Sequence, residues 1–179
     1  MLESDNLEKK IHEIYQHHYL DVYKFIICYS GNQNDAEDMT QEVFIRVLKN
    51  VSKYNHSASL KTWIFSIAKH VAIDHYRKTR FTIALKEGFF KQLTSNEKGP
   101  IEYVEQNAMK NYVHEAISKI RPNYRMVLIL RGINELSIKE TAQILNYSES
   151  KVKVVYHRAL KELEKMISCD IREVIQHES

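Results

Sequence analysis

Glycine and proline are scarce in this chain, which has four glycines and two prolines among 179 residues. Because these residues interrupt helices, their scarcity, together with few runs that alternate at period two, predicts an almost wholly α-helical protein. Cysteine is also rare, and Cys28 and Cys169 match no metal-binding or redox spacing, so we expect two unpaired thiols and no disulfide framework.

Long apolar runs are absent too, and none approaches the length that a bilayer requires. A secretory signal has a basic segment followed by an apolar one. The N-terminal residues MLESDNLEKK contain neither. We therefore expect a cytoplasmic protein. The sequence also lacks a Gly-rich phosphate loop, H-E-x-x-H, C-x-x-C and G-x-S-x-G, so we expect no catalytic residues, no cofactor and no metal site.

Charge is unevenly distributed along the chain, although the net charge is only +3. Residues 1–42 contain three Lys/Arg and nine Asp/Glu, a net −6, whereas residues 43–80 contain eight Lys/Arg and one acid, Asp74, a net +7. This separation favours two partner surfaces, one for a basic protein element and one for nucleic acid. A dipolar domain that is simply solvated is the alternative.

Helical periodicity divides the first part of the chain into three segments. The first extends from Leu7 to Ile27 and is stopped by Ser30-Gly31-Asn32; the second begins at a cap formed by Asn34 or Asp35 and reaches about Val51. Ser59 can cap a third helix, whose apolar stripe contains Trp63, so we expect Trp63 to pack in the core. After Thr79 the pattern weakens, and helical character returns at residues 105–120 and 124–130.

Residues 137–165 predict two short helices around a tight polar turn, the arrangement that places one helix in a DNA groove. Ser137 and Glu140 form a capping box for the first helix, Asn146-Tyr147 ends it, and Ser148 caps the second. A buried stripe is expected at Val152, Val155, Tyr156, Ala159, Leu160 and Leu163. The opposite, cationic face suits phosphates and base edges and comprises Ser150, Lys151, Lys153, Val154, His157, Arg158 and Lys161. A surface hairpin with solvated lysines is the alternative when this segment is considered alone.

The chain contains three collinear motifs: DAEDMTQEVFIRVLKN at 35–50, SLKTWIFSIAKHVAIDHYRK at 59–78, and the segment 121–163. Together they resemble the extracytoplasmic-function (ECF) group of bacterial RNA polymerase sigma factors of the sigma-70 family. The last helix is similar to that of the Bacillus-type sigma-X subgroup. The resemblance implies an all-α protein of two small helical domains, region two at 7–79 and region four at 106–168, joined by a linker at 80–105.

The resemblance also implies roles for particular residues. The acidic helix would dock on core RNA polymerase through Asp35, Glu37, Asp38, Gln41, Glu42 and Phe44. The following loop and third helix would hold the −10 element of promoter DNA through Lys53, Tyr54, Asn55, His56, Lys61, Lys69, Arg77 and Lys78. Within this set Tyr54, which lies in the polar loop, is the better candidate than Trp63 for stacking on a base.

The last helix would read the −35 element, but here the sequence departs from the family pattern. Positions 154 and 155 often hold a small polar residue and an arginine in the family, and both are valine in this chain. The base preference therefore does not transfer. By family analogy, a membrane-anchored anti-sigma factor is expected to hold the chain inactive.

Two functions remain in view at this point. The favoured one is a sigma factor that gives core RNA polymerase its promoter specificity and catalyses nothing itself. The alternative is a free-standing helix-turn-helix regulator, which would need a ligand pocket or a dimer seam. A pure protein-interaction adaptor leaves the cationic face of residues 151–161 unexplained.

Overall fold

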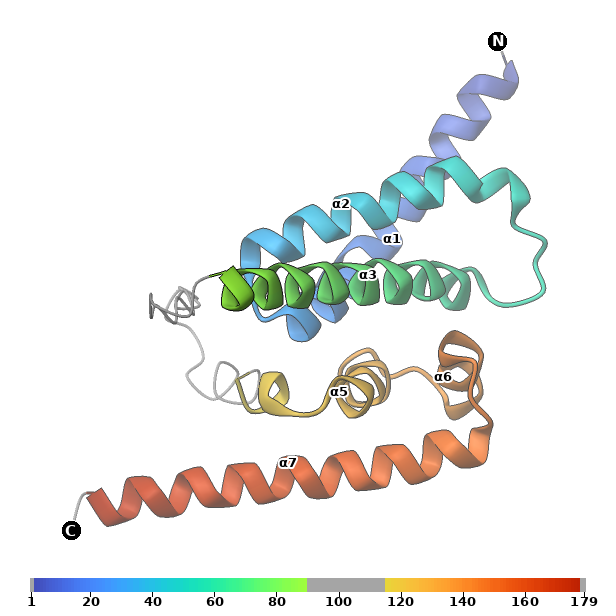
Figure 1. Cartoon of the computed structure of the whole chain (residues 1–179). Coiled ribbons are helices and arrows are strands. Elements are labelled where there is room, and N and C mark those ends of the chain that lie inside the picture. Colours follow the sequence, from blue (N-terminus) through green and yellow to red (C-terminus); the bar gives the residue numbers. More distant parts are fainter. Residues whose placement is uncertain (1, 90–114, 178–179) are drawn as a thin grey trace.

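A computed structural model describes residues 2–89 and 115–177, and within these ranges every regular element is helical (Figure 1). The all-α prediction is therefore confirmed. The elements are α1 (Leu2–Ser30), α2 (Gln33–Asn50), the short helix η1 (Val51–Lys53), α3 (Leu60–Phe89), α5 (Pro122–Leu128), the π-helix η2 (Ile129–Ile133), α6 (Ile138–Leu145) and α7 (Glu149–His177). Residues 115–119 form a further helical turn before α5.

Helices α1, α2 and α3 pack against one another and form an N-terminal three-helix domain (Figure 1). Their apolar stripes meet in a core in which the side chains of Phe25 and Phe65 have no exposed surface and lie edge to face, with ring centroids 5.7 Å apart. Burial of each such side chain contributes about 1.5–3 kcal/mol. The same core contains Val22, Ile26, Val43, Val47, Ile64 and Ala68.

Caps and turns fix where these helices begin. Gly31 adopts a left-handed φ of +70°, which suits glycine, and lets the chain reverse between α1 and α2. The cap of α2 is Asn32, whose side chain accepts a hydrogen bond from the Asp35 N–H at 3.0 Å, so the predicted caps Asn34 and Asp35 were wrong by two or three residues. Ser59 caps α3 as predicted, because its Oγ accepts a hydrogen bond from the Thr62 N–H at 3.1 Å.

Helix α3 is longer than the sequence predicted. It continues to Phe89, so the expected domain boundary between residues 79 and 80 falls inside a helix. Phe81, which belongs to the predicted linker, lies on this extension and is 66% exposed. The rest of the predicted linker and residues 106–114 of the predicted second domain lie outside the described residues.

The C-terminal elements form a second domain with small cores of its own. Pro122 starts α5 at a position where its missing N–H costs nothing. One cluster joins Ile120, Leu128 and Ala159, and another joins Val127, Ala142 and Val152. These contacts place α7 across α5 and α6.

The two domains are packed together instead of standing apart. Helices α5 and α6 lie between α3 and α7 in Figure 1, and α6 contacts both of these long helices. The largest core cluster continues across the boundary, because it unites the N-terminal residues with a C-terminal set comprising Ile117, Met126, Ile129, Leu130, Leu136 and Ile144.

Candidate polymerase-binding and nucleic-acid-binding surfaces

The six residues expected to bind core polymerase fall on two faces of α2. Glu37, Asp38 and Gln41 are exposed on its outer face. Asp35 and Glu42 are half-buried and turn towards other side chains: Asp35 lies 3.6 Å from the ring of His75 on α3, and Glu42 accepts a 2.7 Å hydrogen bond from Arg46.

Phe44 is 5% exposed, so it supports this surface from beneath. Its ring lies edge to face with Tyr15 of α1, with centroids 4.9 Å apart. The outer face of α2 continues beyond Gln41 through two aliphatic side chains that sequence reasoning missed, Ile45 at 44% and Leu48 at 41% exposure. Their spacing from Gln41, at i+4 and i+7, was the available signal. The surface is therefore acidic at one end and apolar at the other.

The loop between η1 and α3 is held in shape by its own side chains. The Tyr54 hydroxyl donates a 2.6 Å hydrogen bond to the Ala58 carbonyl, and the Asn55 side chain accepts one from the Ser57 N–H at 3.1 Å. His56 adopts a left-handed φ of 57°, which is uncommon for a residue with a side chain. Its ring centroid lies 4.4 Å from that of Tyr54, which is half-buried.

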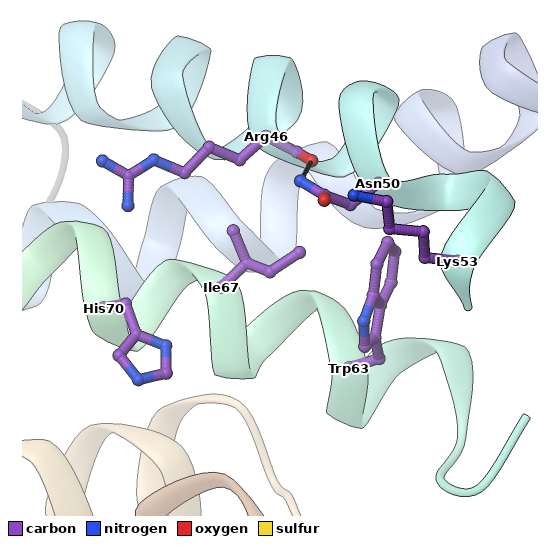
Figure 2. Close-up of a pocket in the computed structure, with 6 residues that line it drawn as sticks. All are labelled: Arg46, Asn50, Lys53, Trp63, Ile67 and His70. Carbon is purple, nitrogen blue, oxygen red and sulfur yellow. Dashed lines mark hydrogen bonds between the residues drawn. The ribbon is translucent and has the colours of Figure 1, made fainter. Parts of the chain in front are cut away.

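Trp63 packs against the core and also lines an open cleft of about 330 Å³ between α2 and α3. The prediction that this residue belongs to the core is therefore incomplete, because its side chain is only half-buried and its ring lies 5.1 Å from that of Tyr54. Figure 2 shows the indole standing between the two helices, below Asn50 and Lys53. The cleft is lined by Arg46, Asn50, Lys53, Trp63, Ile67 and His70.

Of these lining residues, only Lys53 was expected to contact DNA. Arg46 and Asn50 lie one turn apart on α2, with the Asn50 amide donating a 2.8 Å hydrogen bond to the Arg46 carbonyl. His70 lies two turns beyond Trp63 on α3 and is exposed. The cleft thus combines one aromatic ring with several nitrogen donors, of which Arg46 is paired with Glu42 and Asp74. These are the groups that an unstacked base and its phosphate require.

The remaining cations of the expected −10 surface are not equally available. Arg77 and Lys78 are exposed, whereas Lys61 lies 2.9 Å from the carboxylate of Asp21 on α1. Lys69 donates a 2.8 Å hydrogen bond to the main-chain carbonyl of Ile144 on α6, and burial lowers its pKa.

The turn between α6 and α7 has the geometry that its sequence predicts. Ser137 accepts a hydrogen bond from the Glu140 N–H at 3.1 Å, and Glu140 accepts one from the Ser137 N–H at 2.9 Å, which completes the capping box. The Ser137 hydroxyl also donates a 2.6 Å hydrogen bond to the Glu140 carboxylate, and this bond, followed by that from the Ser137 N–H, lowers the pKa of Glu140. Asn146 ends α6 in a left-handed conformation, and Ser148 caps α7 through the Lys151 N–H at 3.1 Å.

The outer face of α7 is open along its whole predicted length. Val152 and Ala159 are fully buried, and Val154 is 47% exposed, as the helical rotation inferred from the sequence requires. Leu160 is 41% exposed, so its predicted place in the buried stripe was wrong. All seven residues predicted on the opposite face are exposed: Ser150, Lys151, Lys153, Val154, His157, Arg158 and Lys161.

The described residues contain no group of three or more His, Cys, Asp or Glu side chains that could hold a metal ion. Among the described helices, none is both long enough and apolar enough to span a membrane.

The chain matches two protein-family models and is similar to characterised proteins along most of its length. Residues 14–82 match the model of sigma-70 region 2, and residues 110–163 match that of sigma-70 region 4. The chain is 37% identical over 163 residues to the ECF RNA polymerase sigma factor SigX of Bacillus subtilis, covering 89% of this chain and 84% of SigX. It is 34% identical to SigM of the same organism, covering 86% of this chain and 92% of SigM.

Solved structures agree on the fold. The sigma factor RpoE, in complex with the anti-sigma factor NepR from Bartonella quintana, superposes with a TM-score of 0.73 at 20% identity and covers 90% of this chain and 99% of that one. CnrH, in complex with the cytosolic domain of CnrY, has a TM-score of 0.68 at 17% identity and covers 91% and 90%. Together with the two matched family models, this fold defines a protein of the sigma-70 class.

Within that class, the chain belongs to the ECF group of RNA polymerase sigma factors. The resemblance inferred from its three motifs is confirmed. Family membership favours the sigma factor over the free-standing regulator.

Proposed function

We propose that three separate surfaces of this chain carry out the work of an ECF sigma factor. The outer face of α2 docks on core RNA polymerase, the cleft and loop between α2 and α3 hold the −10 element, and α7 reads the −35 element. Without catalysing a reaction, the chain directs the polymerase to promoters and helps to open the duplex. Its place of action is the cytoplasm, where core polymerase works.

The observation that carries this proposal is the separation of charge onto different exposed faces. Glu37 and Asp38 are exposed on α2, whereas Lys153, Arg158 and Lys161 are exposed on α7. An acidic face that continues into Ile45 and Leu48 suits a basic, partly apolar protein helix and repels DNA. The α7 face suits the phosphates and base edges of a major groove.

The polymerase-binding role of α2 is tested by charge reversal at the exposed carboxylates. Glu37→Lys together with Asp38→Lys should weaken capture of core polymerase while leaving the fold intact, because both side chains are exposed and such surface substitutions usually change stability by less than about 0.5 kcal/mol each. Asp35→Lys is the matched comparison. It should affect binding less, because Asp35 already faces His75. Undiminished capture by the double variant would contradict the docking role.

Sequence-specific initiation is tested by in vitro transcription with purified core polymerase over a pool of promoters. Initiation from a defined subset is the expected result. Core polymerase that ignores the added chain, while the chain alone binds duplex DNA tightly at physiological salt, would favour a free-standing regulator instead.

An anti-sigma partner is part of the proposal by family analogy. The RpoE and CnrH structures described above are themselves complexes with an anti-sigma factor and with the cytosolic domain of CnrY, respectively. For this chain we expect the cytoplasmic segment of a membrane-anchored protein. The full chain should co-purify with membrane fractions from its host, and this association should be lost when the host is placed under conditions that activate the chain. Both results together would identify such a partner.

A further inference from the structure

The turn between α6 and α7 holds Tyr147 in a fixed backbone position. Tyr147 follows Asn146, the left-handed residue that ends α6, and its N–H donates a 3.0 Å hydrogen bond to the Ala142 carbonyl. This bond belongs to the pattern that closes a helix after a left-handed residue. On the other side, Ser148 caps α7. Two helix ends therefore meet at Tyr147 and leave its backbone little freedom.

The ring of Tyr147 contacts both an apolar cluster and a cation. It is half-buried and packs against the cluster of Val127, Ala142 and Val152. Tyr147 precedes the cap of α7 and Val152 is the fourth residue inside the helix, which is the spacing of a hydrophobic staple. The Nζ of Lys151 lies 3.6 Å from the ring centroid. An ammonium within about 6 Å of an aromatic centroid is attracted by the ring.

Helix stability does not explain a lysine at position 151. Lys151 lies in the first turn of α7, where the positive end of the helix dipole disfavours a cation and favours an acid such as Glu149. No carboxylate among the described residues forms an ion pair with Lys151. Its ammonium has three N–H donors, and a ring on one side leaves the outward ones free. The side chain is therefore held in place for an anion from outside the described chain.

Lys151 lies on the flank of the exposed face of α7. Successive residues of an α-helix are rotated by about 100°. Val152 and Ala159 mark the buried side, and Val154 and His157 lie on the opposite side. Lys151 lies between these two sides. When a helix enters a major groove, its central face meets the bases, and its flanks lie nearer the phosphates. The position of Lys151 therefore favours a phosphate over a base edge.

We propose that Tyr147 is a positioning residue, whose ring holds the Lys151 ammonium ready to contact a DNA phosphate and so sets the register in which α7 enters the groove. The proposal rests on the −35 role proposed for α7 above. Phosphate contacts orient a protein on the duplex, whereas base contacts specify the sequence. Because the lysine side chain is ordered before binding, less entropy is lost when the complex forms.

The expected size of the effect follows from the strength of the pair. Attraction between a cation and an aromatic ring at an exposed site corresponds to about two- to fivefold in an equilibrium constant. Loss of the ring should weaken binding to all duplexes by this factor, because a phosphate contact carries no sequence information.

Two substitutions separate the ring from the staple. Tyr147→Phe keeps both the ring and the apolar contact with Val152, whereas Tyr147→Leu keeps an apolar contact without a ring. Tyr124→Leu is the matched control, because it removes a ring from another cation pair of the same domain: Arg121 lies 4.4 Å from the Tyr124 centroid, on α5. Melting curves establish that each variant is folded.

Nuclear magnetic resonance on the full chain without DNA tests the pair directly. The Lys151 ε-methylene is bonded to Nζ and therefore lies close to the ring, whose current shifts its proton signals upfield. This shift should be present in the wild type and in Tyr147→Phe, and absent in Tyr147→Leu. A Lys151 ε-methylene signal at the position of a free lysine in the wild type would overturn the proposal.

Fluorescence anisotropy of the full chain with duplex DNA of random sequence measures the phosphate contact. Tyr147→Leu should bind about two- to fivefold more weakly, whereas Tyr147→Phe and Tyr124→Leu should bind as the wild type does. Lys151→Gln should also weaken binding and reduce the slope of log K against log salt by about 0.9. With Lys151→Gln present, Tyr147→Leu should have no further effect.

Three results of this titration would overturn the positioning role. The first is wild-type binding by Tyr147→Leu. The second is equal weakening by Tyr147→Phe and Tyr147→Leu, which would assign the effect to the hydroxyl. The third is an undiminished effect of Tyr147→Leu when Lys151→Gln is present, which would assign it to the staple.

Lys161→Ala distinguishes failure of this proposal from failure of the proposed function, because Lys161 lies on the exposed face of α7 three turns from the Tyr147 ring. If Lys161→Ala weakens duplex binding and Lys151→Gln does not, the positioning role is overturned and the DNA-binding role of α7 stands. If neither substitution weakens binding, the DNA-binding role of α7 fails, and the positioning role fails with it.

Discussion

Helices α3 and α7 are nearly equal in length, with 30 and 29 residues, and both carry the cations expected to meet DNA. They differ in what covers them. On α7 every predicted contact is exposed, whereas on α3 two of the lysines are engaged inside the chain, Lys61 by Asp21 and Lys69 by Ile144. The comparison shows that two helices of similar length and charge can differ in how many of their cations are free to meet a partner.

The largest expected effect concerns base stacking on an aromatic side chain of α3, Trp63. Trp63→Ala removes the aromatic ring that lines the cleft, and stacking of a base on such a ring is worth about 1–3 kcal/mol. Run-off transcription from a double-stranded promoter should fall by about fivefold or more, since 1.4 kcal/mol is tenfold. Trp63→Phe, which keeps a ring, should retain part of the activity. Full activity of Trp63→Ala would show that the cleft holds no base.

The reading of a base edge on α7 is tested by Val154→Ser. Val154 is 47% exposed and therefore contributes little to folding, but its methyl groups can contact a thymine methyl. The variant should melt at the wild-type temperature and lose up to about 1–3 kcal/mol of discrimination between promoters that differ only at −35 thymines. A large drop in melting temperature would mean that the helix is rotated and the residue is core.

Salt dependence separates an open cation from an engaged one. Lys161→Ala on α7 should weaken binding of the free chain to all duplexes alike and reduce the slope of log K against log salt by about 0.9, the value for one phosphate contact. Lys69→Ala should leave that slope unchanged, because Lys69 is bonded to Ile144. Equal reductions for both variants would show that Lys69 is free to contact DNA in the free chain.

The smallest expected effect concerns α6, which packs on both long helices. Ser137→Ala removes the capping box and should cost about 1 kcal/mol of folding free energy. Because hydrogen bonds from Ser137 lower the pKa of Glu140 in the folded state, their stabilisation is present above the usual carboxyl pKa of 4.5 and is lost as pH falls below it. Melting curves should show the wild type and Ser137→Ala converging on acidification. A difference independent of pH would assign the effect to the hydrogen bond that the Ser137 hydroxyl accepts from the Glu140 N–H.

Much of the fold follows from local sequence signals. The capping box at Ser137 and Glu140, the end of α6 at Asn146 and the cap at Ser148 were all predicted, because each depends only on neighbouring residues. The cap of α2 was placed two or three residues late, since Asn32 and Asn34 are chemically alike and only the turn at Gly31 selects the first.

Features that depend on packing between distant residues were harder to predict. Periodicity gives the buried side of a helix but not the edge of the stripe, so Trp63 and Leu160 were both assigned to the core although they lie at its margin. The contact between Lys69 and Ile144 joins positions 75 residues apart, and no spacing signals it. For the candidate site, the residue types and the helix faces that carry them could be predicted. Whether each side chain is exposed or bonded within the chain could not.

The loop that precedes α3 has a kinetic consequence. Its shape is set within the chain by the Tyr54–Ala58 and Asn55–Ser57 hydrogen bonds, with His56 locked in a left-handed conformation. A strand that docks here in the proposed −10 role would meet a preorganised surface, and little binding free energy would be spent on ordering the loop. Differences among bases should then appear mainly in how long each strand stays bound, because the speed of first encounter is common to all of them.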